Sequence, residues 1–220
     1  MLLEIACFNL ESALTAQKAG AQRIELCENY KDGGVTPSHD LIKRAKKELS
    51  IPVFVMIRPR SGNFIYSDEE FEQMKKEILF CKEHRCDGLV FGILTPENKI
   101  DVERCQELTE LAKPLPCTFH RAFDEVSNTD EALEQLCALG FSRILTSGKA
   151  KTAIKGVGQI KELITKAKGR ITIMPGGGIR SANVSGLIKE TGAVEIHTAA
   201  ILDKSETANE NEIKQILRSI

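Results

Sequence analysis

The feature that most constrains this chain is an alternation, repeated eight times, of short apolar runs and segments with helical periodicity. Several apolar runs have no polar side, which is typical of parallel strands covered by helices. The chain of 220 residues gives each repeat about 27 residues, enough for one strand and one helix. We therefore expect a single (βα)8 TIM-type barrel over residues 1–220. Its predicted strands are Leu3–Cys7, Arg23–Cys27, Val53–Arg58, Leu89–Phe91, Cys117–His120, Arg143–Leu145, Ile171–Met174 and Val194–His197.

The segments between the strands carry helix signals. Ser67 and Glu70 form a capping-box pattern ahead of an apolar face. Near the end, the polar segment Asp203–Glu212 is expected to connect the barrel to a short amphipathic helix that starts at Ile213. No change in composition divides the chain, so one domain is the simplest interpretation.

Composition narrows the function classes. Lys and Arg total 30 against 31 Asp and Glu, so the net charge of -1 gives no reason to expect nucleic acid as a partner. The longest apolar runs, such as Val53–Ile57, are too short to span a membrane, and no secretory signal is visible. The seven cysteines lack the spacing of a disulfide framework. These observations favour a cytoplasmic protein with reduced thiols.

Alternation along each strand separates residues that face the helices from those that face the barrel interior. An interior of this kind is normally filled by Val, Ile and Leu. Here the predicted inward positions are mostly polar: Glu4, Glu25, Cys27, Arg58, Thr118, His120, Glu195 and His197. Burying so many ionisable groups is unfavourable unless they are paired or hydrogen-bonded.

Two interpretations of this polar interior remain open. It could be an internal salt-bridge network, with Arg58 among the three glutamates, that only satisfies a polar core. Alternatively, it could be a site at the strand ends, where barrel enzymes place their catalytic residues. Two histidines that each end an inward-alternating strand favour the site. The candidate catalytic residues are Glu25, Arg58, His120, Arg121, Asp124, Glu195 and His197.

Two glycine-containing loops follow the sixth and seventh predicted strands. Backbone amides in such loops suit a phosphate or another oxyanion, and barrels often bind phosphate near strands seven and eight. Arg58 and Arg60 flank a proline and could clamp a carboxylate or phosphate beside them. The alternative is that the glycines only form tight turns. The candidate anion-binding residues are Arg60, Thr146, Ser147, Gly148, Gly176, Gly177 and Gly178.

Cys7 and Cys27 end neighbouring predicted strands, and two adjacent thiolates suit Cu(I). Strict alternation from Glu4 turns Cys7 outward, so a shared metal requires the strand end to bend. Cys81, Cys105 and Cys137 fall on apolar helix faces and are interpreted as packing residues.

Several motifs together resemble the CutC copper-homeostasis family over Leu3 to about Ala199. They are Glu4-Ile-Ala-Cys7, Ala19-Gly-Ala-Gln-Arg-Ile-Glu-Leu-Cys27, Gly33-Gly-Val-Thr-Pro-Ser38, Ile57-Arg-Pro-Arg-Ser-Gly62, Thr118-Phe-His-Arg-Ala-Phe-Asp124, Leu145-Thr-Ser-Gly148, Met174-Pro-Gly-Gly-Gly178 and Glu195-Ile-His197. The resemblance implies a TIM-type barrel, a cytoplasmic location, a homo-oligomer (dimer or tetramer) and a link to copper. The family's proposed Cu(I) ligands fall on Cys7 and Cys27.

Two functional hypotheses follow. The first is a cytoplasmic copper-homeostasis protein that binds Cu(I) at its two strand-end cysteines. The second is a lyase or isomerase that acts on a small phosphorylated or carboxylated metabolite at the rim of the barrel. A fold shared by so many activities does not decide between them.

Overall fold

The computed structural model describes residues 1–220 and contains eight parallel strands surrounded by helices. The strands are β1 (Leu2–Cys7), β2 (Arg23–Leu26), β3 (Val53–Met56), β4 (Gly88–Phe91), β5 (Cys117–Phe119), β6 (Arg143–Thr146), β7 (Thr172–Pro175) and β8 (Glu195–Thr198). The predicted TIM-type barrel is confirmed. Several strands end earlier than predicted, so Cys27, Arg58 and His120 lie just beyond them in the loops.

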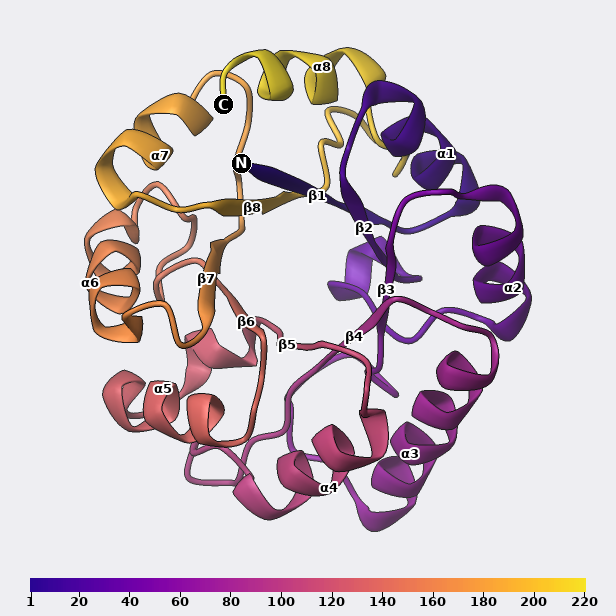
Figure 1. Ribbon diagram of the computed structural model, residues 1–220, viewed down its shortest axis with the longest axis vertical. Coiled ribbons are helices and arrows are strands. Elements are labelled where there is room, and N and C mark those ends of the chain that lie inside the picture. The colour runs from indigo at the N-terminus through magenta and orange to yellow at the C-terminus, as the bar shows by residue number, and fades with distance from the viewer.

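Eight α-helices form a ring around the strands (Figure 1). None of them is both long and apolar enough to cross a lipid bilayer. The capping box at Ser67 and Glu70 is present at the start of α3. The helices are α1 (Leu10–Ala19), α2 (His39–Glu48), α3 (Asp68–Glu83), α4 (Val102–Ala112), α5 (Thr129–Ala138), α6 (Val157–Ala167), α7 (Val184–Thr191) and α8 (Glu210–Arg218).

The last helix begins at Glu210, three residues before the start expected from the sequence. The side chain of Asn209 caps it by accepting a hydrogen bond from the Glu212 backbone N–H. Glu210 and Glu212 then lie in the first turn, where negative charge is favourable. The polar residues that suggested a connector are therefore partly the cap and first turn of the helix.

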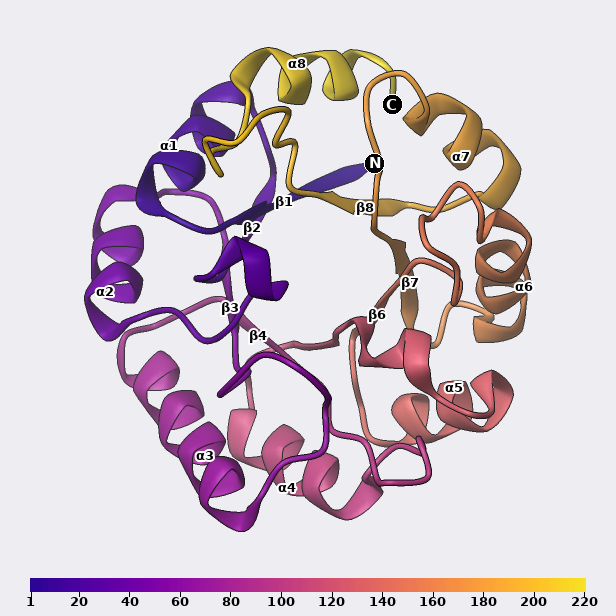
Figure 2. The same ribbon diagram turned by 180° about the vertical axis from the view of Figure 1, so that it is seen from behind.

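The strands pair in sequence order from β1 to β7, and β8 pairs with β1. Between β7 and β8 the barrel closes through a single bridge, Gly176 with His197. Gly176 has no side chain because a Cβ there would lie 2.5 Å from Leu145. Figure 2 shows the end of the barrel where loops leave the strands, with the short 3-10 helix Tyr30–Asp32 lying across it.

The main core lies between the strands and the helices and gathers 53 buried apolar residues. The barrel interior holds only a small apolar cluster, formed by Cys27, Phe54, Met56 and Val90. The remaining interior is polar, and this polar column leads from the amino end of the barrel to the pocket at its other end.

Candidate active site at the carboxyl end of the barrel

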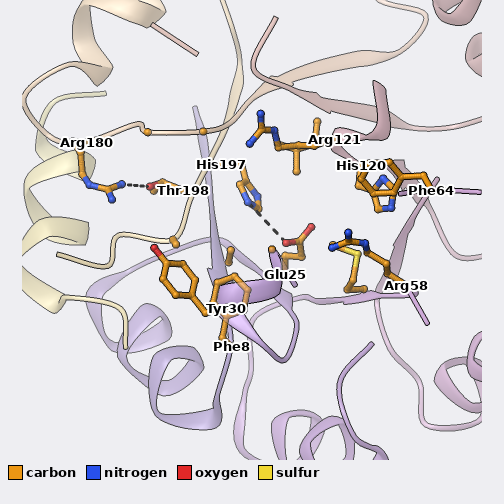
Figure 3. Close-up of a pocket in the computed structure, with 17 residues that line it drawn as sticks. Phe8, Glu25, Tyr30, Arg58, Phe64, His120, Arg121, Arg180, His197 and Thr198 are labelled. Atoms are coloured by element: carbon orange, nitrogen blue, oxygen red, sulfur yellow. Dashed lines mark hydrogen bonds and ion pairs between the residues drawn. The ribbon is translucent and has the colours of Figure 1, made fainter. Parts of the chain in front are cut away.

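A cavity of about 300 Å³ opens at the carboxyl end of the barrel. Glu25, His197 and His120 line it from β2, β8 and the end of β5. Arg58, Arg121 and Arg180 surround it from the loops, and aromatic side chains close part of its mouth (Figure 3). A concave site with few convergent polar groups is the usual form of a small-molecule site.

Below the cavity, the ionic layer of the interior is built around Arg23. Its guanidinium donates to Glu4, and its Nη2 lies 2.5 Å from the Glu195 carboxylate. Arg143 reaches the same Glu195 oxygen at 3.0 Å. The guanidinium groups of Arg23 and Arg143 also pack on Phe54, at 4.8 and 5.1 Å from its ring centre, respectively. Glu195 therefore belongs to this layer and does not line the cavity.

His197 connects this ionic layer to the cavity. Its Nδ1 lies 2.7 Å from Glu4 Oε1, so that hydrogen bond fixes the ring. Its Nε2 faces Glu25 Oε2 at 3.9 Å, the contact drawn in Figure 3. Glu25 Oε1 is buried and has no hydrogen-bond partner in the protein. The cavity floor thus carries an imidazole and a carboxylate with unused capacity.

Burial and neighbouring charges shift the pKa values of Glu4, Glu25 and His197 in different directions. Burial alone would raise the pKa of Glu4, but the hydrogen bond from His197 and the charge of Arg23 lower that pKa to about 2. Burial raises the pKa of Glu25, and the neighbouring His197 only partly offsets this effect. Burial opposes protonation of His197, yet Glu25 and Glu4 raise its pKa overall. Two groups with raised pKa values face each other, an arrangement suited to proton transfer.

Glu4, Glu25 and His197 also form the only cluster of potential metal-binding side chains (His, Cys, Asp or Glu) in the structure. Their ligand atoms lie within 4.8 Å of one another, close enough to suggest a cation site. However, Glu4 already binds Arg23 through one oxygen and His197 through the other. Of these three residues, only Glu25 and His197, through its Nε2, therefore face the cavity with an atom free to bind a ligand.

Arg58 does not join the interior network that its position suggested. It lies beyond the end of β3, and its guanidinium donates to three backbone carbonyls, those of Asp32, Gly34 and Gly62, at 2.8–3.0 Å. Its role in the structure is to hold together two loops at the mouth of the cavity. Arg23, which lies beside Glu4 in the strand register, supplies the interior charge instead.

Arg60 is bound within its own loop. It donates to Glu70 at 2.6 Å and to the carbonyls of Ser61, Asn63 and Ile65. It does not line the cavity. The charge of Arg60 is therefore engaged with the protein itself, away from the candidate site.

The loop Thr146–Lys149 is occupied by the carboxylate of Asp124. That carboxylate accepts hydrogen bonds from the Thr146 hydroxyl, from the Ser147 amide and hydroxyl, and from the Lys149 amide. The Gly148 amide donates to the Thr146 hydroxyl at 2.9 Å. The cradle that the sequence suggested at Thr146, Ser147 and Gly148 is thus formed, and a residue of the chain occupies it.

Asp124 and Ser147 in turn orient Arg121. Arg121 Nε lies 2.8 Å from Asp124, and Nη2 lies 2.9 Å from the Ser147 hydroxyl. Nη1 has no acceptor in the protein and points toward Gly177, where a Cβ would lie 3.5 Å from it. One guanidinium nitrogen is therefore available at the wall of the cavity.

The backbone after β7 supplies further donors beside Arg121. Gly177 and Gly178 adopt φ values of 98° and 74°, and neither amide donates within the protein. Both glycines line the cavity, whereas the Gly176 amide is used by the Thr146 carbonyl. Arg180 follows and is held by the carbonyls of Ile179 and Ile201. Two free amides and one free guanidinium nitrogen therefore belong to neighbouring residues at the cavity wall, a set of donors suited to an anion.

Comparison with known proteins agrees with this architecture. The family model described as "CutC family" matches residues 1–202. The chain belongs to the CutC family. A human relative named "Copper homeostasis protein cutC homolog" is 50% identical over 199 residues, which cover 90% of this chain and 73% of the relative. A family protein CutC from Parabacteroides distasonis is 46% identical over 214 residues, 96% of this chain and 88% of that protein.

Solved structures give the same result. A crystal structure of the CutC protein from Streptococcus agalactiae superposes with a TM-score of 0.87 at 41% identity, covering 90% of this chain and 98% of that one. Phosphoribosyl anthranilate isomerase from Thermotoga maritima aligns with 100% of this chain and 98% of its own at a TM-score of 0.66. Its identity is 17%, so it shares the fold alone.

The two cysteines that the CutC resemblance singles out lie side by side, because the Cys27 amide donates to the Cys7 carbonyl at 2.8 Å. Cys7 is in register with Leu26, so its side chain faces the helices, while Cys27 packs inside the barrel with Phe54. Burial, together with the nearby charge of Glu25, raises the pKa of both thiols well above the usual value. Cys27 Sγ contacts Glu25 at 3.3 Å.

Three charged residues in or beside the candidate site of this CutC-family chain escaped the sequence reasoning. Arg23 and Arg143 occupy inward positions of β2 and β6 by the same alternation that identified Glu25, and that signal could have found them. Arg180 lies two residues after the quoted glycine motif, but its direction depends on the Ile201 carbonyl, 21 residues downstream. The sequence carries no local sign of that contact.

Proposed function

We propose that this CutC-family protein binds a small phosphorylated or carboxylated metabolite in the cavity and transfers a proton on it, as a lyase or isomerase does. The observation that carries the proposal is Glu25, a buried carboxylate whose Oε1 has no partner and whose other oxygen faces His197 at 3.9 Å. A buried polar atom without a partner is unfavourable by about 1–3 kcal/mol, and a bound ligand relieves that penalty.

Within this proposal, each residue has a distinct role. Glu25 and His197 act as the general base and acid, since both reach the cavity and both have raised pKa values. Arg121 and the free amides of Gly177 and Gly178 hold the anionic group. We further propose that the protein works in the cytoplasm as a homo-oligomer.

A variant pair tests the anion site. We expect Arg121→Gln to weaken binding of inorganic phosphate about tenfold, because a charge-assisted hydrogen bond contributes roughly 1.5–3 kcal/mol. Arg60→Gln is the matched control, since Arg60 is bound in its own loop and is absent from the cavity wall. Phosphate titration followed by NMR should shift the Gly177 and Gly178 amides of the wild type. If neither amide shifts at millimolar phosphate, the site is not an anion site.

Copper(I) at Cys7 and Cys27 is the second candidate function. The hydrogen bond between the two backbones favours it, and soft thiolates suit Cu(I). The positions and the protonation of the two thiols, however, do not suit a shared ion. The side chains face opposite sides of the sheet, and burial keeps both thiols protonated. A shared Cu(I) in this pair requires deprotonation and rotation of a side chain, so the present conformation does not fit the ion.

Titration of the reduced protein with Cu(I) against a competing chelator tests this second candidate. Binding at the pair predicts that the variant C7S/C27S loses Cu(I) affinity by tenfold or more, about 1.4 kcal/mol. The matched control is C105S/C117S, which removes two other buried thiols. Equal affinity in the wild type and in C7S/C27S would exclude the pair as the copper site.

A further inference from the structure

The cavity is lined by an uncharged hydrogen-bond donor, His120, as well as by the Glu25 carboxylate, and these two groups define the ligand further. We propose that His120 donates its Nε2–H to a carbonyl oxygen of the ligand, and that the ligand is a phosphorylated α-hydroxycarbonyl compound. This inference rests on the proposed function, because it assigns the substrate class of the same cavity.

The first step of the argument is the tautomer of His120. The Ala122 backbone N–H donates to His120 Nδ1 at 3.2 Å, so Nδ1 carries no proton. In the neutral ring the proton is therefore on Nε2. His120 lines the cavity, and its Nε2 is buried without a partner. The protein has thus formed an N–H donor and has left it without an acceptor.

The second step concerns the charge and rigidity of the ring. Burial and the adjacent positive charge of Arg58 lower the pKa of His120 to about 3, so the ring stays neutral near pH 7. Phe64 packs on it with the ring centres 4.7 Å apart. On another side, a Cβ on Gly92 would lie 2.8 Å from the ring. The donor is therefore held in one place before any ligand arrives, as electrostatic catalysis requires.

The third step is the complementary acceptor. The structure has four buried side-chain polar atoms without a partner: Glu25 Oε1, Arg58 Nε, Tyr66 Oη and His120 Nε2. Tyr66 and Arg58 interact with each other, which leaves Glu25 and His120, and both of these residues line the cavity. Buried polar atoms normally find partners, so their concentration here indicates that a ligand completes the set. The ligand must offer an acceptor to His120 and a hydrogen-bond donor to Glu25.

An α-hydroxycarbonyl compound offers both groups on adjacent carbons. Its phosphate would lie against Arg121 and the free glycine amides. In the reaction, Glu25 removes a proton from the carbon next to the carbonyl, and the electron pair of that C–H bond forms the C=C bond of an enediol. The carbonyl electron pair moves to oxygen, where the His120 N–H stabilises it. The hydroxyl proton of this intermediate passes to the former carbonyl oxygen as the hydroxyl carbon becomes the new carbonyl. Glu25 returns its proton to the former carbonyl carbon, which gives the isomer with no oxidant or reductant.

The test compares two probes. 2-Phosphoglycolate carries a phosphate and a planar carboxylate that resembles the enediol oxygens, whereas inorganic phosphate carries the anion alone. We expect the wild type to bind 2-phosphoglycolate at least tenfold more tightly than phosphate in calorimetry. His120→Asn should remove this advantage and leave phosphate binding unchanged. His39→Asn, which alters an exposed histidine on α2, should change neither value.

The outcomes separate the two proposals. Equal affinity of the wild type for both probes overturns the assignment of His120 and leaves the anion site standing. Failure of the wild type to bind phosphate overturns the proposed function. If His120→Asn does not fold, nitrogen NMR of the wild type decides. A neutral ring with its proton on Nε2 between about pH 5 and 8, whose signal shifts with 2-phosphoglycolate, supports the inference. A charged ring, or a proton on Nδ1, contradicts it.

Discussion

Replacement of Arg23 by methionine is expected to lower the free energy of unfolding by about 3–5 kcal/mol. Arg23 is 4% exposed in its side chain and bridges the carboxylates of Glu4 and Glu195 inside the barrel. Its removal leaves two buried carboxylates underpaired, Glu4 with His197 alone and Glu195 with Arg143 alone. Urea denaturation of the variant and the wild type measures the loss.

The matched control for this prediction is Arg44→Met. Arg44 also lies between two carboxylates, Asp40 and Glu48, but its side chain is 55% exposed. Solvent screens such pairs, so we expect a change below about 1 kcal/mol. Similar losses for both variants would mean that the interior layer behaves as a surface network and does not depend on Arg23.

Acidification is expected to remove the contribution of Glu4 between about pH 5 and pH 2. The pKa of Glu4 is about 2 in the folded protein and 4.5 without the fold. The unfolded chain therefore binds the proton first as the pH falls, and stability decreases. The integrated loss is on the order of 3 kcal/mol. His197 does not contribute in this range, since its raised pKa keeps it protonated in both states.

Glu4→Gln isolates this effect. Glu25, with its raised pKa, changes stability in the opposite direction as the pH falls, but burial, the main cause of that shift, is the same in both proteins. The difference between the wild-type and variant unfolding free energies should therefore shrink from pH 5 to pH 2. Glu210→Gln is the control, because the ion pairs of Glu210 with Lys18 and Lys214 lie on the surface, where solvent screens them, so this variant's difference from the wild type should change little with pH. If the difference in unfolding free energy between the wild type and Glu4→Gln stayed constant from pH 5 to pH 2, the low pKa assigned to Glu4 in the folded protein would be wrong.

The fold could be predicted because it depends on local patterns. Each apolar run and each helical period lies within one repeat, and the barrel follows from repeating them eight times. Alternation also placed Glu25 and His197 correctly in the barrel, since side-chain direction in a strand is a local property. It failed to position Arg58 because β3 ends at Met56, and alternation carries no information beyond a strand.

The partners of the site residues could not be predicted for a related reason. The sequence shows that Thr146–Gly148 can form an anion cradle, but not that Asp124 reaches it from 22 residues away. Likewise, the choice between Arg23 and Arg58 as the interior cation depends on the register of β1 and β2, which pairs Glu4 with Arg23. Such choices depend on distances between elements, and no short motif encodes them.

The carboxylate of Asp124 is attached to the same chain as the loop that binds it. Attachment gives a group an effective concentration that small metabolites free in solution rarely match. An anion competing for the amides of Ser147 and Lys149 would have to displace a partner that never diffuses away. Asp124 thus shields this loop from changing phosphate or carboxylate levels, and in the proposed anion site only Arg121 and the amides of Gly177 and Gly178 are left to respond to them.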